Sequence, residues 1–174
     1  IERNYDMRLN KYIASAGICS RRKADELISN GNVKINGAVV TQMGVSVGEN
    51  DSVEVNGKLL DSEGRKVYVA VNKPLGYITS MEDEKGRATV AELVGDIAER
   101  IFPVGRLDYN TTGLLIMTND GELANRIIHP RHEVYKTYVA RVSGIISDAR
   151  IARLRKGVDI GGFITSPAKV KLIK

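Results

Sequence analysis

The chain has 174 residues, and its 26 Lys and Arg against 21 Asp and Glu give a formal net charge of +5. This length is enough for one large domain or two small ones with a real hydrophobic core. The sequence contains no apolar run long enough to cross a membrane. Its single cysteine, Cys19, has no partner for an internal disulfide, which favours a reducing compartment such as the cytoplasm.

The positive charge is unevenly distributed along the chain. Residues 7–47 carry six Lys and Arg against two Asp and Glu, and residues 131–174 carry ten against three. The intervening residues 67–130 carry six against nine. Two basic segments on either side of a mildly acidic one indicate a polyanion such as nucleic acid as the partner. The alternative is a basic surface that only faces solvent.

Two short helices are expected near the N-terminus. Leu9, Ile13 and Ala16 recur at helical spacing, and Ser20 is placed to cap a second helix with an apolar stripe. The first turn of that helix carries Arg21, Arg22 and Lys23, although cations there oppose the helix dipole. These cations make the helix less stable and gain no structural contact in return, which suggests that their side chains have a function.

Two hairpins are expected after these helices. Asn36-Gly37 and Asn56-Gly57 each separate two short apolar runs, and Asn-Gly is the preferred two-residue hairpin turn. Residues 7–60 therefore form a small α+β module that can present a basic helix. The polar residues 61–66 are interpreted as a linker, and residues 67–174 as a second domain.

The second domain is organised around residues 102–118. They are interpreted as an apolar run, a polar loop that carries Asp108, and a buried strand from Gly113 to Thr118. A carboxylate on a loop between two buried segments is where catalytic groups tend to lie. From spacing alone Asp108 is more simply explained as a brace of its own turn, because Asp is a common turn residue.

Further elements are expected on both sides of this stretch. A strand begins at Val67, and Thr89 with Glu92 forms a capping box. Asn119 is interpreted as the cap of the next helix. Residues 135–142 alternate as a strand with Lys136 and Tyr138 on one face, Ser147 opens a basic helix, and a Gly-rich strand segment closes the chain.

The sequence favours neither a metal site nor a cofactor site. His129 and His132 are separated by a proline and lack a nearby Cys or carboxylate cluster. Neither a phosphate-cradling loop nor a dinucleotide fingerprint is found.

The N-terminal module resembles a known RNA-binding family. The segments Arg8 to Ile13, Gly17 to Asp25 and Gly31 to Gly37 resemble, in the same order, the small module first seen in ribosomal protein S-four. The resemblance implies that Arg21, Arg22 and Lys23 contact phosphates of structured RNA, with Arg8 and Lys11 as further RNA-binding residues. Such RNA is recognised mostly through its backbone and shape, which agrees with a basic helix that lacks aromatic residues.

The second domain resembles the pseudouridine synthases of the RsuA type, which modify ribosomal RNA, and within them the large-subunit branch. Four motifs in order carry this resemblance: Lys73 to Gly76, Gly105 to Asp108, Thr112 to Leu115 and Lys136 to Val139. It implies that Asp108 is the catalytic carboxylate and acts at the ribose of a flipped-out uridine, and that Tyr138 stacks on the uracil. Arg106 and Lys136 would hold Asp108 ionised or contact phosphate, and Lys73 would contact the RNA backbone.

In one respect the chain departs from this family. In the members that it resembles, a later segment, rich in Asn, Arg and Gln and followed by Arg-Arg-Met, supplies an arginine that pairs with the catalytic aspartate, and it also supplies the closing strands of the sheet. The sequence lacks this segment, so a C-terminal truncation is expected, and with it an incomplete catalytic domain whose activity as a separate chain is in doubt.

These observations lead to one interpretation of the fold and the function. The fold is α+β: a helix-helix-hairpin module followed by a mixed, largely antiparallel sheet with helices, incomplete at its C-terminus. The function is isomerisation of a specific uridine in ribosomal RNA, by a cytoplasmic monomer that uses no metal, cofactor or membrane. The alternative is a non-catalytic ribosome-assembly factor that binds ribosomal RNA. A hydrolase is disfavoured because a second acid is missing from the motif.

Overall fold

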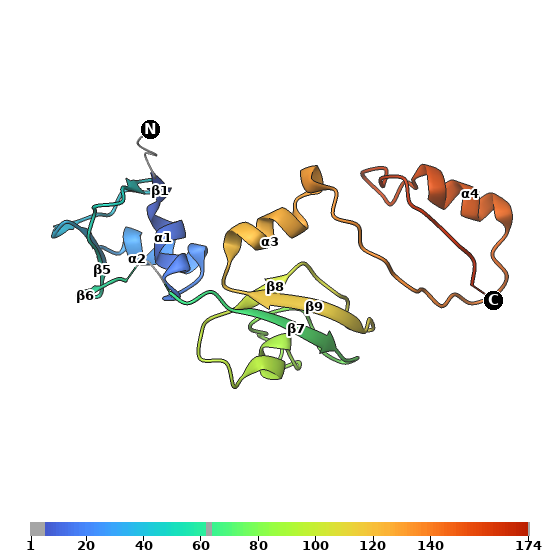
Figure 1. The fold of residues 1–174 in the computed structure, drawn as a ribbon, viewed down its shortest axis with the longest axis horizontal. Coiled ribbons are helices and arrows are strands. Elements are labelled where there is room, and N and C mark those ends of the chain that lie inside the picture. The colour runs from blue at the N-terminus through green and yellow to red at the C-terminus, as the bar shows by residue number, and fades with distance from the viewer. Residues whose placement is uncertain (1–5, 62–63, 174) are drawn as a thin grey trace. The chain divides into compact units, whose positions relative to one another are not determined.

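The computed structural model describes residues 6–61 and 64–173. It divides the chain into two compact units, of which the first ends at Val134 and the second begins at Tyr135 (Figure 1). Each unit is described by itself. Among the described residues, every helix is too short or too polar to span a lipid bilayer.

The N-terminal module begins with two helices. Strand β1 (Met7–Arg8) leads into α1 (Leu9–Ser15), and α2 (Arg21–Ser29) follows a short turn. The Ser20 hydroxyl accepts a hydrogen bond from the Lys23 backbone N–H, as expected for the cap of α2. Strand β1 pairs with β4 (Ser46–Val47) in an antiparallel ladder.

The module continues as a four-stranded antiparallel sheet in the order β3-β2-β5-β6. Its strands are β2 (Val33–Ile35), β3 (Ala38–Val39), β5 (Val53–Val55) and β6 (Lys58–Leu59). Asn36 and Asn56 have φ angles of 50° and 51°, and the glycine after each is also left-handed. Both predicted Asn-Gly hairpins are therefore confirmed, because this geometry suits the turn that such pairs favour.

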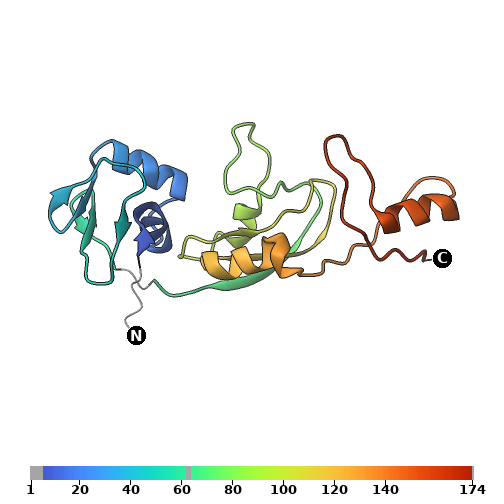
Figure 2. The ribbon, with the colours of Figure 1, turned by 90° about the horizontal axis from the view of Figure 1, so that it is seen from above.

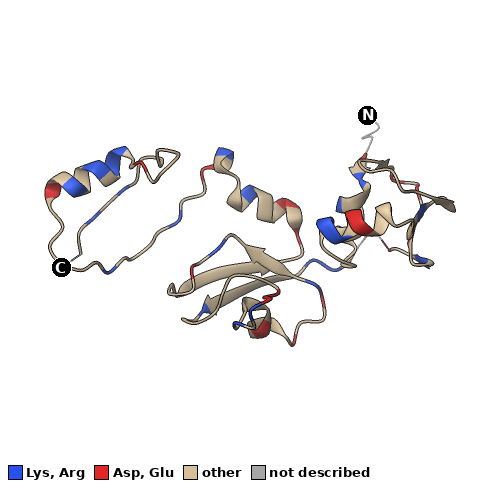
Figure 3. Ribbon diagram, turned by 180° about the vertical axis from the view of Figure 1, so that it is seen from behind, with Lys and Arg blue, Asp and Glu red and all other residues tan. Residues whose placement is uncertain are grey.

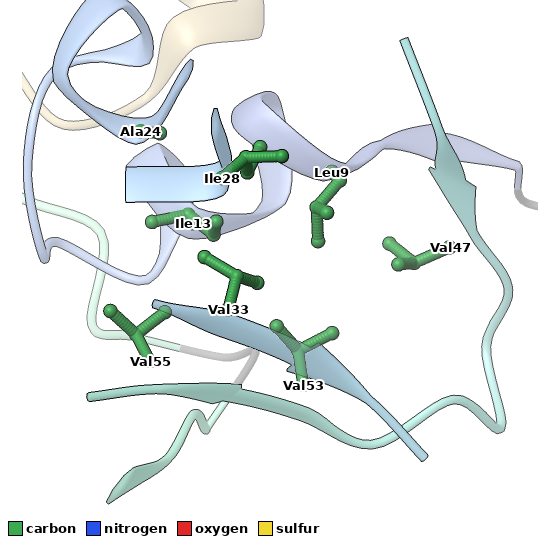
Figure 4. Close-up of a cluster of buried hydrophobic side chains, with 8 residues drawn as sticks. All are labelled: Leu9, Ile13, Ala24, Ile28, Val33, Val47, Val53 and Val55. Carbon is green, nitrogen blue, oxygen red and sulfur yellow. The ribbon is translucent and has the colours of Figure 1, made fainter. Parts of the chain in front are cut away.

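One hydrophobic core holds the module together. The apolar stripes of α1 and α2 and the inward positions of β2 and β5 meet there, as Figure 4 shows. The eight buried residues are Leu9, Ile13, Ala24, Ile28, Val33, Val47, Val53 and Val55. The first turn of α2 lies outside this core, so its basic residues remain at the surface.

A second core belongs to a three-stranded antiparallel sheet of order β7-β9-β8. Its strands are β7 (Tyr68–Lys73), β8 (Phe102–Val104) and β9 (Gly113–Thr118). The 3-10 turn η1 (Val90–Val94) lies on one side of this sheet and helix α3 (Gly121–Ile128) on the other, as Figures 1 and 2 show. The loop between β8 and β9 carries Asp108.

The two predicted caps in this region have different outcomes. The capping box of Thr89 and Glu92 is confirmed at the start of η1. The cap of α3 is Asp120 and not Asn119, because the Asp120 carboxylate accepts the N–H groups of Glu122 and Leu123. Asn119 instead accepts from the Val67 backbone and donates to the Arg65 carbonyl. A long-range contact therefore occupies its amide.

The second unit contains helix α4 (Asp148–Lys156), which Ser147 caps as predicted. The predicted strand over residues 135–142 is wrong in this structure, since these residues are in irregular, exposed backbone. The closing Gly-rich segment is not a strand either and forms only a bridge between Asp159 and Ile164. A strand needs a paired neighbour for its backbone hydrogen bonds, and among the described residues these two segments form no ladder beyond this bridge.

In the sequence, the predicted linker, residues 61–66, comes after the residues of the first core and before those of the second. Residues 62 and 63 of it lie outside the described residues. The division into domains 7–60 and 67–174 stays a prediction.

Candidate active site

Asp108 lies on an exposed loop that we call the Asp108 loop, residues 105–112. A left-handed glycine stands at its start, where Gly105 has φ +83°, and another directly follows it, where Gly113 has φ +133°. The side chain of Leu107 packs against the second core, whereas its neighbour Asp108 is exposed. The loop therefore has an anchored residue next to an accessible carboxylate.

Lys73 holds the second half of this loop, from Asp108 to Thr111, by hydrogen bonds from the interior of the domain. Its side chain is fully buried, at 0% exposed. The ammonium nitrogen donates to the carbonyl oxygens of Asp108 at 3.0 Å and Thr111 at 2.8 Å, and to that of Pro74 at 3.1 Å. A lysine ammonium has three N–H donors, so the three carbonyls satisfy all of them. This is the condition under which so polar a group is tolerated in an interior.

This position differs from the expected contact of Lys73 with the RNA backbone. A fully buried amine with three carbonyl partners is not offered to a phosphate at the surface in this structure. The sequence contains the signal for this. Val69, Val71 and Lys73 alternate along β7, and all three face the side of the sheet that packs inward.

Two further contacts hold the Asp108 loop. The Gly76 N–H donates to the Tyr109 carbonyl at 3.1 Å, and the Thr79 hydroxyl bonds both backbone groups of Leu107. Thr79 is not among the site residues predicted from the sequence. It lies in a polar segment 28 residues from Leu107, and no local pattern marks such a contact.

The remaining predicted site residues lie in both units. Arg106 is exposed on the Asp108 loop, two residues from Asp108. Lys136 and Tyr138 belong to the second unit, where Tyr138 is 62% exposed. Their association with Asp108 stays a prediction. Two cavities in the first unit have volumes of about 470 and 260 Å³, and Asp108 lines neither.

A charged turn lies between β7 and η1. The Arg87 guanidinium donates to both carboxylate oxygens of Asp83, at 2.6 and 3.2 Å, and the backbone N–H groups of Lys85 and Arg87 add two more bonds. These bonds hold the pKa of Asp83 at about 2, below its ordinary value of 3.8, with the Arg87 side chain as the largest cause. The turn is thus tied by a carboxylate that is ionised at neutral pH.

The predicted RNA-binding residues of the N-terminal module differ in how their charges are engaged. Arg21, Arg22 and Lys23 are all exposed on the first turn of α2. Lys23 pairs with Glu26 at 2.7 Å, which raises its pKa, chiefly through that hydrogen bond. Arg8 donates to the Gly44 carbonyl, and Lys11 pairs with Glu122 at 3.3 Å. Figure 3 shows basic residues on helices toward both ends of the chain.

The sequence matches two known families. Residues 67–168 match the family described as RNA pseudouridylate synthase, and residues 7–53 match the S4 domain. The chain belongs to the RNA pseudouridine synthase family. Its arrangement, with an N-terminal S4 domain, is that of the RsuA type, and the enzymes of this family are isomerases.

Individual relatives agree with this assignment. The chain is 49% identical to a ribosomal large subunit pseudouridine synthase B from Bacillus subtilis (strain 168), over 95% of this chain and 68% of that protein. It is 41% identical to a dual-specificity RNA pseudouridine synthase RluF from Shigella flexneri, over 95% of this chain and 57% of that protein. A crystal structure of a pseudouridylate synthase matches 97% of this chain and 73% of its own, with 27% identity and a TM-score of 0.56.

The expected family and the expected α+β fold are thus confirmed, and so is the expectation that the protein is an enzyme. The roles of individual residues in catalysis and RNA binding stay predictions.

Proposed function

We propose that this protein converts a specific uridine of large-subunit ribosomal RNA to pseudouridine, with Asp108 as the essential group. The ribosomal substrate is supported by the name of the Bacillus subtilis relative. The role of Asp108 is supported by one structural observation. Its carboxylate is exposed, while the backbone of its loop is fixed by buried contacts from Lys73.

The reaction exchanges one bond at the ribose for another. The bond between the anomeric carbon and ring nitrogen one of uracil breaks, the base turns, and ring carbon five bonds to the same anomeric carbon. Carbon five loses a proton and nitrogen one gains one, so no oxidant or reductant is needed. The target uridine must first leave the RNA stack, which costs a few kcal/mol.

Asp108 has two chemical routes in this scheme. Its carboxylate attacks the anomeric carbon, as the nucleophile of a retaining glycosidase does, or it removes a proton from the neighbouring sugar carbon. Both routes require an accessible carboxylate on a backbone that does not move. Arg106, on the same loop, is proposed to contact phosphate or to pair with the Asp108 carboxylate.

The second unit is proposed to supply the contact with the base. The exposed ring of Tyr138 offers a face on which a flipped uracil stacks. Lys136, which precedes it by two residues, is proposed to act with Arg106 on the phosphate backbone. The first turn of α2 is proposed to bind structured RNA through Arg21 and Arg22.

Asp108→Asn tests this proposal. The substrate is unmodified ribosomal RNA, transcribed with tritium on carbon five of uridine, so that each conversion releases tritium. We expect the full-length gene product to release tritium and the variant to release none above background, with RNA binding unchanged. Asp96→Asn, which alters another exposed aspartate of the first unit, serves as the matched control and should keep full activity.

Tritium release that persists in Asp108→Asn would remove Asp108 from the mechanism. RNA binding without any release by the unaltered protein would support the assembly factor instead.

A further inference from the structure

The hydroxyl of Thr79 makes two hydrogen bonds to a single distant residue. It donates to the Leu107 carbonyl at 2.6 Å and accepts the Leu107 N–H at 3.1 Å. One side chain therefore satisfies both backbone groups of Leu107, as a neighbouring strand would do. Leu107 directly precedes Asp108, so this contact fixes the chain one residue upstream of the carboxylate.

Thr79 is itself held by a rigid part of the fold. Its neighbour Ile78 donates to the Ala88 carbonyl at 2.9 Å and accepts from Val90 at 3.0 Å. Val90 is fully buried at the start of η1, and the capping box of Thr89 and Glu92 closes that end of the turn. The contact thus joins the Asp108 loop to a segment that is itself bonded to the start of η1 and the second core.

The Thr79 contact and the Lys73 contact act on opposite sides of Asp108. Thr79 fixes Leu107, and Lys73 fixes the carbonyls of Asp108 and Thr111. The side chain of Leu107 is also packed against the second core. With the backbone fixed on both sides, the position of the Asp108 Cα and the direction of its Cα–Cβ bond are fixed, and the exposed carboxylate turns only about the two bonds of its own side chain.

We propose that Thr79 is a positioning residue of this enzyme, whose hydroxyl aims the Asp108 carboxylate at the ribose by fixing Leu107. The inference rests on the proposed role of Asp108. Thr79 does not touch the substrate, so its loss acts on the chemical step and leaves RNA affinity unchanged. A catalytic group displaced by about 1 Å commonly loses about a hundredfold in rate.

Thr79→Val tests this inference, because it removes the hydroxyl while keeping the shape of the side chain. In the tritium-release assay with the full-length gene product, we expect kcat to fall by about 10- to 100-fold and KM for RNA to stay within about twofold. Thr79→Ser restores the hydroxyl and should recover most of kcat. Thr79→Cys, with a weaker donor and acceptor, should be intermediate, and it replaces Thr79→Val if that variant fails to fold.

Thr118→Val is the matched control. Thr118 is fully buried, whereas Thr79 is half-buried, and the Thr118 hydroxyl likewise donates to a carbonyl, that of Val67, and accepts a backbone N–H, that of Asp120. It stands at the end of β9 away from the Asp108 loop, five residues after Gly113, which is roughly 17 Å along a strand. It should lower the thermal midpoint about as much as Thr79→Val does, with an unchanged kcat.

Several outcomes would overturn the inference. They are an unaltered kcat in Thr79→Val, an equal loss of kcat in Thr118→Val, or a failure of Thr79→Ser to recover activity. Asp108→Asn is measured in parallel to separate the two proposals. If Asp108→Asn is inactive and Thr79→Val is normal, only the positioning role fails. If Asp108→Asn is active, the proposed function itself fails.

Discussion

The Asp108 loop and the first turn of α2 both present candidate functional side chains at the surface, but the fold supports them differently. Hydrogen bonds from the buried Lys73 and the half-buried Thr79 to backbone groups hold the Asp108 loop. The first turn of α2 rests on an apolar core, and Arg21 and Arg22 extend from it into solvent. A group that acts at one atom needs a fixed backbone, whereas charges that attract a polyanion act over a distance.

The two regions should therefore respond differently to mutation. Loss of one hydrogen-bonding side chain should disable the Asp108 loop. Loss of charge from α2 should weaken RNA binding in steps.

Lys73→Met should have the largest effect. It keeps an unbranched side chain of similar length but leaves the carbonyls of Pro74, Asp108 and Thr111 without their donor. An unpaired buried polar group costs about 1–3 kcal/mol, and Pro74 and Asp108 are exposed residues whose carbonyls water can reach, so we expect the free energy of unfolding to fall by about 1–3 kcal/mol in total. The displaced loop should lower kcat by about a hundredfold. Denaturant unfolding and tritium release measure the two effects.

Lys34→Met controls for the change of residue type, because Lys34 is an exposed strand lysine of the N-terminal module. It should alter neither the free energy of unfolding nor kcat. A Lys73→Met variant with normal kcat would show that the Asp108 loop does not need this support.

Arg21→Ala with Arg22→Ala should come next. We expect RNA affinity to fall about tenfold, and the slope of log affinity against log salt to decrease by about 0.7–0.9 for each lost phosphate contact. Stability should not change, because both side chains are exposed. Lys23→Ala should lower RNA affinity less than a single alanine substitution of Arg21 or Arg22, since the Lys23 ammonium is already paired with Glu26.

The double variant Lys34→Ala with Lys58→Ala removes the same charge from exposed sites on strands of the same module. An equal loss of affinity there would mean that only net charge matters. An unchanged salt slope in the α2 variant would exclude this turn from the RNA interface.

Ser20→Ala should have a smaller effect, confined to stability. The Ser20 hydroxyl accepts the Lys23 N–H at the start of α2, and removal of such a cap costs about 1 kcal/mol. Ser29→Ala alters the other end of the same helix, where the hydroxyl only donates to the Glu26 carbonyl, and should cost less. Thermal unfolding measures both variants, and a smaller loss in Ser20→Ala than in Ser29→Ala would contradict the assigned cap.

The smallest effect should be a pH dependence from Asp83. Its pKa is about 2 in the folded protein and 3.8 ordinarily, so ionised Asp83 stabilises the fold. This contribution is fully present above about pH 4 and is lost as the pH falls through about 2. The difference in thermal midpoint between the wild type and Asp83→Asn should therefore shrink between these values. Arg87→Gln removes the main cause of the low pKa and should move this loss of stability to higher pH. A difference between the wild type and Asp83→Asn that is the same at about pH 4 and about pH 2 would refute this role.

Local features of this protein could be predicted from the sequence with success. The Asn-Gly hairpins, the Ser20 and Ser147 caps and the capping box at Thr89 depend on residues within four positions of one another. The motifs around Lys73 and Asp108 led correctly to the family. The expectation for Asn119 was wrong because its amide bonds residues more than 50 positions away.

Sequence alone determined the two N-terminal helices, the two Asn-Gly hairpins and strands β7 and β9 of the first unit, because hydrophobic period and turn chemistry are local properties. Tertiary structure decided that Lys73 faces inward and that Thr79 contacts Leu107, across separations of 35 and 28 residues. Such contacts depend on the path of the whole chain, which brings backbone groups together that no short pattern relates. The residues that fix the Asp108 carboxylate therefore became visible only in the folded protein.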